Sequence, residues 1–155
     1  MNKTNKDRLT ALERAHLIER YPSVPLHALA FSKWTDTSAN GLTKCVTAWI
    51  QLNGYQAERI NTMGVYREAA KIKDLDGISR TVGRGKWTKS TSTAGSSDIS
   101  ATIKGRSVKI EIKYGRDVQS DAQRRYQESI EKAGGTYLIV TNFDIFVTWY
   151  DDFIQ

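Results

Sequence analysis

The feature that most constrains this chain is an unbroken alternation of polar and apolar residues over positions 107–113. The apolar members are Val108, Ile110 and Ile112, and the charged members are Lys109, Glu111 and Lys113. Successive side chains of a β-strand point to opposite faces, so this pattern predicts a strand with one face in a hydrophobic core. Residues 98–104 alternate in the same way, and Gly105-Arg106 can turn the chain tightly between the two segments. We therefore predict a β-hairpin.

Helix and strand patterns surround this hairpin. Over residues 38–53, apolar side chains recur at the spacing of an amphipathic helix, and residue 54 is a glycine that ends it. The remaining predicted elements are helices over residues 7–20, 119–133 and 144–153 and strands over residues 55–61 and 136–141. The stretch from residue 62 to about residue 88 gives no clear assignment, and residues 88–97 form a polar loop. This order predicts a mixed α/β (α+β) domain over residues 35–155, preceded by an N-terminal helical and irregular arm over residues 1–34.

Composition excludes several classes of protein. A chain of 155 residues has the length of one typical domain. Its single cysteine, Cys45, excludes an intramolecular disulfide and a Cys-based zinc site, and we expect it to be a buried, unreactive thiol. No apolar run reaches the roughly 18–20 residues of a membrane span, and residues 1–20 lack the apolar centre of a signal peptide. The sequence therefore predicts a cytoplasmic protein without a membrane partner.

The net charge of +6 is unevenly distributed, with its excess between residues 77 and 116. That window holds nine lysines and arginines but only two acids, Asp98 and Glu111. Two interpretations are open. Either both acids are counter-ions that relieve local repulsion, or they hold a metal in a nucleic-acid groove, because phosphodiester cleavage uses cations for phosphates and carboxylates for Mg²⁺.

Glu111 and Lys113 project from the same face of their strand, and Asp98 begins the neighbouring strand. The two carboxylates and a backbone carbonyl, that of Ile112, could hold Mg²⁺ and leave positions for water and a phosphate oxygen. Lys113 would then orient or deprotonate the water, or neutralise charge on the phosphate. The alternative is a plain ion pair between Glu111 and Lys113 on an exposed strand, since chance alone gives about one acid-x-Lys triplet in such a chain.

Several segments around these residues resemble the PD-(D/E)XK nuclease superfamily, and within it the branch of virus-type replication-repair nucleases (VRR-NUC). The resemblance spans about residues 41–140, roughly two thirds of the chain. It rests on a linked series of segments, namely residues 95–99, 105–113, 115–117, 119–126 and 133–137.

The resemblance implies a restriction-endonuclease-like core, in which helices flank a central mixed sheet. It implies that Asp98 and Glu111 are the metal-binding acids, Lys113 the catalytic lysine and Gln123 the glutamine of the following helix. The implied activity is hydrolysis of DNA phosphodiester bonds with Mg²⁺ or Mn²⁺. Stand-alone members of the branch are commonly small, viral or bacterial, and dimeric, so we expect a homodimer in the cytoplasm of a bacterial or phage-infected cell.

The sequence departs from the family pattern at two places. The branch usually has a glutamate on the helix before the first strand, and residues 38–53 contain no acid. Asp36 lies just before this helix and Glu58 just after it, so either could substitute, or the site has only two acids. Ser97 stands where the family often has proline, which is a mild change.

Other residues have competing explanations. Ser120 and Gln123 have the spacing of a capping box, which explains Gln123 without catalysis. Tyr126 falls on the apolar stripe of the same helix and is assigned to the core. Trp87 is the tryptophan that we expect to stack on a base. The basic residues expected to hold phosphates are Arg80, Arg84, Lys86, Lys89, Arg106 and Arg116.

Three functional hypotheses follow. The first is a metal-dependent endonuclease acting on branched or nicked DNA in phage or bacterial replication and repair. The second is a DNA-binding module that keeps the nuclease fold without turnover, motivated by the missing helix glutamate. The third is an adaptor whose N-terminal arm binds a protein partner, with the basic window incidental. Metal-dependent DNA cleavage distinguishes the first hypothesis from the other two.

Overall fold

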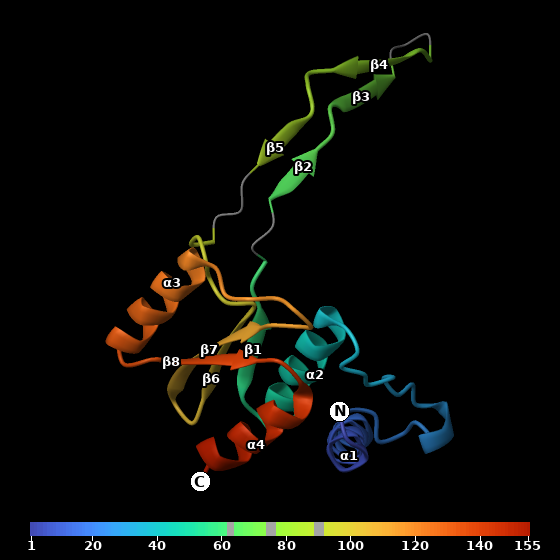
Figure 1. The fold of residues 1–155 in the computed structure, drawn as a ribbon. Coiled ribbons are helices and arrows are strands. Elements are labelled where there is room, and N and C mark those ends of the chain that lie inside the picture. Colours follow the sequence, from blue (N-terminus) through green and yellow to red (C-terminus); the bar gives the residue numbers. More distant parts are fainter. Residues whose placement is uncertain (62–63, 74–76, 89–91) are drawn as a thin grey trace. The chain divides into compact units, whose positions relative to one another are not determined.

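The computed structural model describes residues 1–61, 64–73, 77–88 and 92–155. Contacts within the chain divide it into two units (Figure 1). The sheet unit comprises Met1–Ile60 and Ala94–Gln155, and the ribbon unit comprises Asn61–Thr93. The N-terminal arm expected over residues 1–34 lies within the sheet unit, and the domain boundary after residue 34 stays a prediction.

A four-stranded sheet forms the centre of the sheet unit, in the strand order β1-β6-β7-β8. β6 (Ile99–Ile103) pairs antiparallel with both β1 (Gln56–Arg59) and β7 (Arg106–Ile112). β8 (Thr136–Val140) runs parallel to β7, and the chain crosses between these two strands through α3 (Asp121–Lys132). The sheet is therefore mixed, and the α/β (α+β) class predicted from the sequence is confirmed.

The hairpin of β6 and β7 turns at Lys104-Gly105. Ile103 pairs with Arg106, and the two turn residues have φ angles of 48° and 74°. Positive φ at both central positions is typical of the two-residue turn whose twist matches that of the paired strands. The turn predicted at Gly105-Arg106 is wrong by one residue, because Gly105 takes the second central position of the turn rather than the first.

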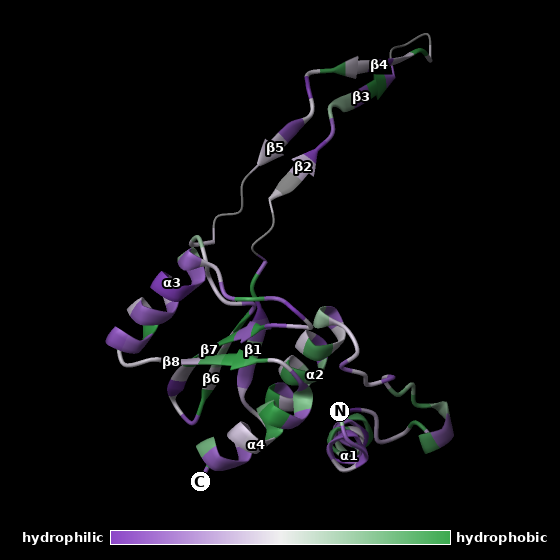
Figure 2. Ribbon diagram, viewed as in Figure 1, coloured by the Kyte–Doolittle hydropathy of each residue, from purple (hydrophilic) through white to green (hydrophobic). Residues whose placement is uncertain are grey.

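The hydrophobic core lies on one face of the sheet, under α2 (Ala39–Leu52) and α4 (Phe143–Phe153) (Figures 1 and 2). The apolar stripe predicted for α2 is buried. The core residues from the sheet and these two helices are Leu42, Cys45, Val46, Trp49, Ile50, Ala57, Ile99, Ala101, Ile103, Val108, Ile110, Ile112, Val140, Phe143, Phe146, Val147 and Tyr150. Among the described residues, no helix combines the length and the apolar character needed to cross a membrane.

α3 lies on the other face of the sheet (Figure 1). Its Tyr126 packs edge-on against Tyr137 of β8, with ring centroids 6.3 Å apart. No residue of α3 is buried, so the assignment of Tyr126 to the core is wrong. The helix instead covers the polar face of β7 with half-buried side chains, which leaves room there for charged groups.

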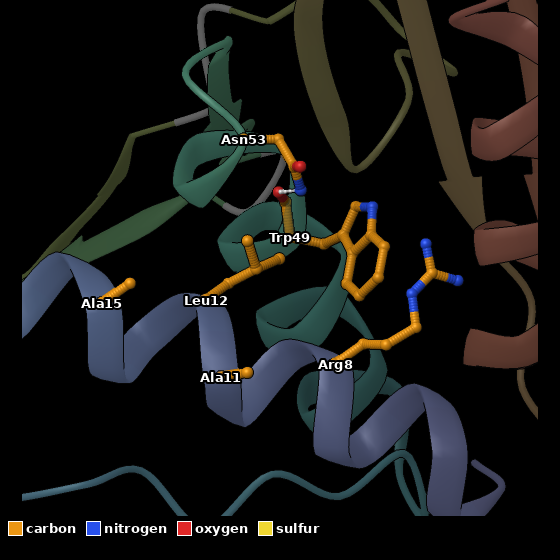
Figure 3. A pocket seen from close by; sticks show the side chains of 6 residues that line it. All are labelled: Arg8, Ala11, Leu12, Ala15, Trp49 and Asn53. Atoms are coloured by element: carbon orange, nitrogen blue, oxygen red, sulfur yellow. Dashed lines mark hydrogen bonds between the residues drawn. The ribbon is translucent and has the colours of Figure 1, made fainter.

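α1 (Lys3–Arg20) is longer than predicted and is followed by the short 3₁₀ helix η1 (Leu26–Ala28). A pocket of about 340 Å³ lies between α1 and α2 (Figure 3). Its lining residues are Arg8, Ala11, Leu12, Ala15, Trp49 and Asn53. The Arg8 guanidinium lies 4.8 Å from the centroid of the Trp49 ring and donates hydrogen bonds of 2.8 and 2.9 Å to Asp151. α1 is thereby tied to both α2 and α4.

Cys45 is buried on α2, as predicted, with its sulfur 3.5 Å from the carbonyl oxygen of Thr35. Burial raises the pKa of this thiol to about 11. At pH 8 we expect at least about a hundredfold less thiolate than an exposed cysteine has, and correspondingly slow reaction with Ellman's reagent. The thiol should titrate at once after unfolding in urea. Rapid reaction in the native protein, measured against Cys45→Ser as the blank, would contradict this burial.

The ribbon unit consists of two antiparallel ladders in the region that gave no clear assignment from sequence (Figure 1). β2 (Val65–Arg67) pairs with β5 (Lys86–Thr88), and β3 (Ala70–Lys73) pairs with β4 (Ser79–Val82). None of its residues with a described side chain is buried. Apolar and polar residues alternate along a strand when one of its faces is buried. Among their described side chains, these strands lack a buried face, which explains why the sequence of this region shows no hydrophobic period.

Candidate active site

The β6–β7 hairpin brings Asp98 and Glu111 together. Ile99 pairs with Ile110, so the next pair along the same register is Asp98 and Glu111. Residues that face each other across an antiparallel pair have Cβ atoms about 4.5–5.5 Å apart. The Asp98 carboxylate accepts a hydrogen bond of 2.9 Å from the amide of Ile112. The two acids that the sequence singled out are therefore neighbours on one face of the sheet.

Glu111 and Lys113 form a buried ion pair on that face. Lys113 Nζ lies 3.0 Å from Glu111 Oε1, and the two residues are only 8% and 2% exposed, respectively. The alternative of an ion pair on an exposed strand is thus wrong, because α3 and β8 cover this end of β7. Removing each of these charges from water costs on the order of several kcal/mol. The pair therefore needs further hydrogen bonds to offset this cost.

The pKa of Glu111 is raised above its ordinary value. Burial is the largest cause, and the negative charge of Asp98 acts in the same direction. The hydrogen bond from Lys113 opposes the shift by favouring the ionised carboxylate. Burial thus disfavours the ionised form of Glu111, and Lys113 favours it.

Gln123 joins this pair to the start of α3. Its Oε1 accepts a hydrogen bond of 3.0 Å from Lys113 Nζ, and its Nε2 donates to Glu111 Oε1. The same Oε1 also accepts from the amide of Ser120, while Ser120 Oγ accepts from the amide of Gln123. The predicted capping box is confirmed, and it holds the Gln123 side chain where it contacts both charged groups. The two explanations given for Gln123 are compatible.

The two roles of Gln123 can be separated by stability measurements. Ser120→Ala removes only the helix cap and is expected to lower the free energy of unfolding by about 1 kcal/mol. Gln123→Leu also removes hydrogen bonds to buried charged groups, so we expect about twice that loss. Urea denaturation of both variants measures the difference. Equal losses would mean that Gln123 contributes nothing beyond the cap.

Two residues of this cluster were missed by sequence reasoning. Tyr137 Oη lies 3.5 Å from Glu111 Oε2, and Asp117 Oδ2 lies 3.4 Å from Lys113 Nζ. Burial and the neighbouring carboxylate of Glu111 raise the pKa of Tyr137, so its hydroxyl stays protonated as a donor. Both residues lie in segments of the family resemblance, residues 115–117 and 133–137, but the resemblance gave neither of them a role. The contact of Tyr137 with Glu111 depends on the parallel register of β7 and β8, which no local pattern reveals.

The loop that leads to Asp98 packs directly on the first turn of α3. Gly95 has a φ of +79°, and a Cβ placed there would lie 2.3 Å from the carbonyl oxygen of Ala122. Only glycine fits such an approach. Ser97 follows with its Oγ donating to the carbonyl of Ile99 at 3.1 Å, so the chain entering β6 is held on both sides.

The predicted phosphate-binding residues are dispersed. Arg106 lies at the far end of β7 from Glu111, where it donates to the carbonyl of Phe153 and stacks 3.7 Å from that residue's ring centroid. The structure therefore does not bring Arg106 to the two acids. Arg116 is exposed in the loop after β7. Of the rest, Arg80, Arg84 and Lys86 lie in the ribbon unit, and Lys89 lies outside the described residues.

The two candidates for a third acid have different surroundings. The Asp36 carboxylate contacts the N-terminal ammonium of Met1 at 2.8 and 2.9 Å and accepts from the amide of Phe143 at 3.2 Å, so it ties the start of α4 to the N-terminus. Glu58 is exposed on β1 and faces Ser100, two residues along β6 from Asp98. Only Glu58 therefore shares the face of the sheet that carries Asp98.

The donor set suits a hard cation. One oxygen of each acid is occupied, since Asp98 Oδ2 accepts from Ile112 and Glu111 Oε1 contacts Lys113. Within the described residues, Asp98 Oδ1 accepts no hydrogen bond and Glu111 Oε2 has only the long contact to Tyr137. Carboxylate and carbonyl oxygens are the ligands that Mg²⁺ prefers. No three His, Cys, Asp or Glu side chains in the described ranges form a metal-binding group, so the Ile112 carbonyl and waters would have to complete the shell.

Comparison with known protein families and curated proteins identifies no relative of this chain. No model of a protein family matches the chain, and no curated protein sequence matches it.

Proposed function

We propose that this chain is a metal-dependent DNA nuclease of the PD-(D/E)XK superfamily, VRR-NUC branch, acting as an endonuclease on branched or nicked DNA. The observation that carries the proposal is the position of Asp98 one step beyond the paired register of β6 and β7, opposite Glu111. Asp98 there accepts a hydrogen bond of 2.9 Å from the Ile112 amide, and the Lys113 ammonium lies 3.0 Å from Glu111. The connection of β7 to the parallel β8 through α3 supports a restriction-endonuclease-like core.

Asp98, Glu111 and the Ile112 carbonyl would hold Mg²⁺ or Mn²⁺. The chemistry supplied by the bound ion is a lowered pKa of a ligated water and compensation of phosphate charge. The protein contributes a polar site on an otherwise buried strand, in which two carboxylates are fixed by the backbone and by α3.

Lys113 is the catalytic lysine of this proposal. Its ammonium is held by Glu111 and Gln123 at 3.0 Å each, so its position is set before DNA arrives. From there it can donate a hydrogen bond to the attacking water or to a phosphate oxygen, and its charge offsets the negative charge that develops there. Gln123 is a positioning residue, because its amide orients both Glu111 and Lys113.

A DNA-binding module without turnover is the second candidate. Two observations favour it. Lys113 and Gln123 already neutralise and hydrogen-bond the Glu111 carboxylate, and within the described residues no third acid lies beside Asp98 and Glu111. This candidate predicts salt-dependent DNA binding without cleavage.

The deciding experiment is cleavage of supercoiled plasmid and of synthetic nicked and four-way-junction DNA with Mg²⁺, Mn²⁺ or EDTA. The nuclease proposal expects cleavage by the parent with metal and none by Glu111→Ala with Lys113→Ala. Glu128→Ala with Lys132→Ala is the matched control, since it removes the same residue types from the exposed side of α3. No cleavage by the parent, or equal cleavage by parent and site variant, would overturn the proposal.

Calorimetric titration with Mn²⁺ separates the two candidates further. A nuclease site should take up Mn²⁺, and Asp98→Ala should abolish that uptake because it removes one of the two carboxylate ligands. DNA binding without any Mn²⁺ uptake would favour the module without turnover.

A further inference from the structure

The ladder of β2 and β5 has two chemically different faces. Tyr66 pairs directly with Trp87, and Arg67 pairs directly with Lys86. Because side chains alternate along a strand, the two aromatic residues share one face and the two cations share the other. Gly64 and Gly85 fall on the aromatic face by the same alternation.

Each aromatic ring lies against a glycine of the opposite strand. A Cβ on Gly85 would lie 1.9 Å from Tyr66 Oη, and a Cβ on Gly64 would lie 2.6 Å from Trp87 Nε1. The rings therefore occupy the space that side chains at these two positions would fill. Tyr66 and Trp87 are nevertheless 57% and 58% exposed, so the outer side of each ring remains accessible. The result is two exposed rings on one face of the ladder, each backed by a glycine of the opposite strand.

The ribbon unit has no hydrophobic core, among its described side chains, in which these rings could be buried. None of its residues with a described side chain is buried, and its strands expose Ile72 and Val82 as well. A two-stranded ribbon without a covering layer is at best marginally stable in water. Exposed aromatic rings on such a ribbon are typical of a binding surface.

The charge of the unit identifies the chemistry of its partner. Residues 61–93 contain seven lysines and arginines and three acids. Arg67 stands directly opposite Lys86, an arrangement of like charges that destabilises a ladder, and within the described residues neither forms an ion pair. A polyanion would remove this repulsion, and one that also carries flat, apolar rings would match the aromatic face.

We propose that Tyr66 and Trp87 form a stacking platform for unpaired DNA bases, while Arg67 and Lys86 on the opposite face contact phosphates. Bases within a duplex stack on each other and offer no free face, whereas unpaired bases at a branch or in a single strand do. The ribbon would therefore select DNA with unpaired bases. The choice of DNA rests on the proposed nuclease function, but the binding itself requires neither metal nor cleavage.

The test is fluorescence anisotropy in EDTA with labelled oligothymidylate and with a duplex of the same length. The parent should bind the single strand at least about tenfold more tightly than the duplex, because base stacking on aromatic side chains contributes most where bases are free. Tyr66→Leu with Trp87→Leu should weaken single-strand binding at least about tenfold and duplex binding by less than about threefold. Leucine keeps an apolar cover over each glycine.

Matched variants separate stacking from charge. Trp87→Phe keeps a flat ring and should retain single-strand binding within about threefold. Arg67→Gln with Lys86→Gln should reduce the slope of log affinity against log salt by about 1.4 for a single strand. Lys3→Gln with Lys6→Gln changes the charge equally on exposed positions of α1 and should leave that slope nearly unchanged.

The proposal is overturned if the parent shows no preference for the single strand, or if the double leucine variant binds it as well as the parent does. It is also overturned if that variant instead loses a dimer seen by sedimentation without DNA, since the platform would then be a contact between copies. The cleavage assays test the nuclease proposal separately from the stacking platform. A protein that binds through the platform but never cuts DNA would contradict only the nuclease, and a nuclease indifferent to the platform would contradict only this inference.

Discussion

Replacing Lys113 with methionine is expected to lower the free energy of unfolding by about 3 kcal/mol at pH 7. Methionine keeps an unbranched apolar stem but leaves the Glu111 carboxylate buried without the ammonium that lies 3.0 Å away. Removing one partner of a buried ion pair costs about 3–5 kcal/mol. We expect the lower end, because Gln123 still donates to Glu111. Urea denaturation of parent and variant measures the loss.

The control and the rescue for this prediction lie on the same strand. Lys109→Met removes an ammonium from the same face of β7, but its partner is the neutral hydroxyl of Ser100 at 2.5 Å, so we expect a loss below about 1 kcal/mol. Adding Glu111→Gln to Lys113→Met should restore at least about 1 kcal/mol, since no buried charge then remains unpaired. A double variant no more stable than Lys113→Met would refute the argument.

The loss in Lys113→Met should also depend on pH. Burial already raises the pKa of Glu111, and Lys113 opposes that shift, so the variant has a still higher pKa in its folded state. A carboxyl group whose folded pKa exceeds its unfolded pKa binds its proton more tightly when folded. Its destabilising effect is therefore full above the folded pKa and shrinks as the pH falls through that value. The deficit of the variant relative to the parent should decrease as the pH is lowered from 7.

Local patterns were sufficient to predict the elements of the sheet unit that have a buried face. The alternation of residues 107–113 predicted β7, and the helical spacing of the apolar residues from Leu42 to Ile50 predicted α2, because in both cases one side must enter the core. The ribbon unit escaped prediction for the opposite reason. Its residues with described side chains are not buried, so the sequence there shows no period set by a core. Two of its aromatic rings, those of Tyr66 and Trp87, lie against glycines instead.

The part of the candidate site that lies on the β6–β7 hairpin was predictable from the sequence. Pairing of β6 with β7 follows from their alternation, and that pairing alone places Asp98 opposite Glu111. The burial of Lys113 was not predictable, because it depends on how α3 and β8 return to the sheet over a long connection. Gln123 has one predictable role and one unpredictable role. Its capping box is local in sequence, whereas its hydrogen bonds to Glu111 and Lys113 depend on how α3 packs on the sheet.

If the chain is the proposed nuclease, Asp98→Asn is expected to lower the rate of metal-dependent DNA cleavage at least about 100-fold while leaving the fold intact. Asparagine keeps an acceptor for the amide of Ile112, so the local backbone hydrogen bond survives. It removes the negative charge from one of the two proposed metal ligands. Mutating groups one step further from a metal already costs about 10–100-fold, so loss of a ligand should cost at least the upper value. Plasmid cleavage with Mn²⁺ gives the rate, and circular dichroism tests the fold.

Glu58→Gln is the matched control, and it also decides whether the site uses a third acid. Glu58 lies on the same face of the sheet but on β1, one strand further from Glu111, and it is exposed. We expect its variant to cleave within about threefold of the parent, because screening by water makes an exposed charge at that distance a weak influence on the metal. A loss as large as that of Asp98→Asn would instead make Glu58 the acid that replaces the missing helix glutamate. Full activity in both variants would remove the carboxylates of Asp98 and Glu58 from the mechanism and with them the basis of the proposed site.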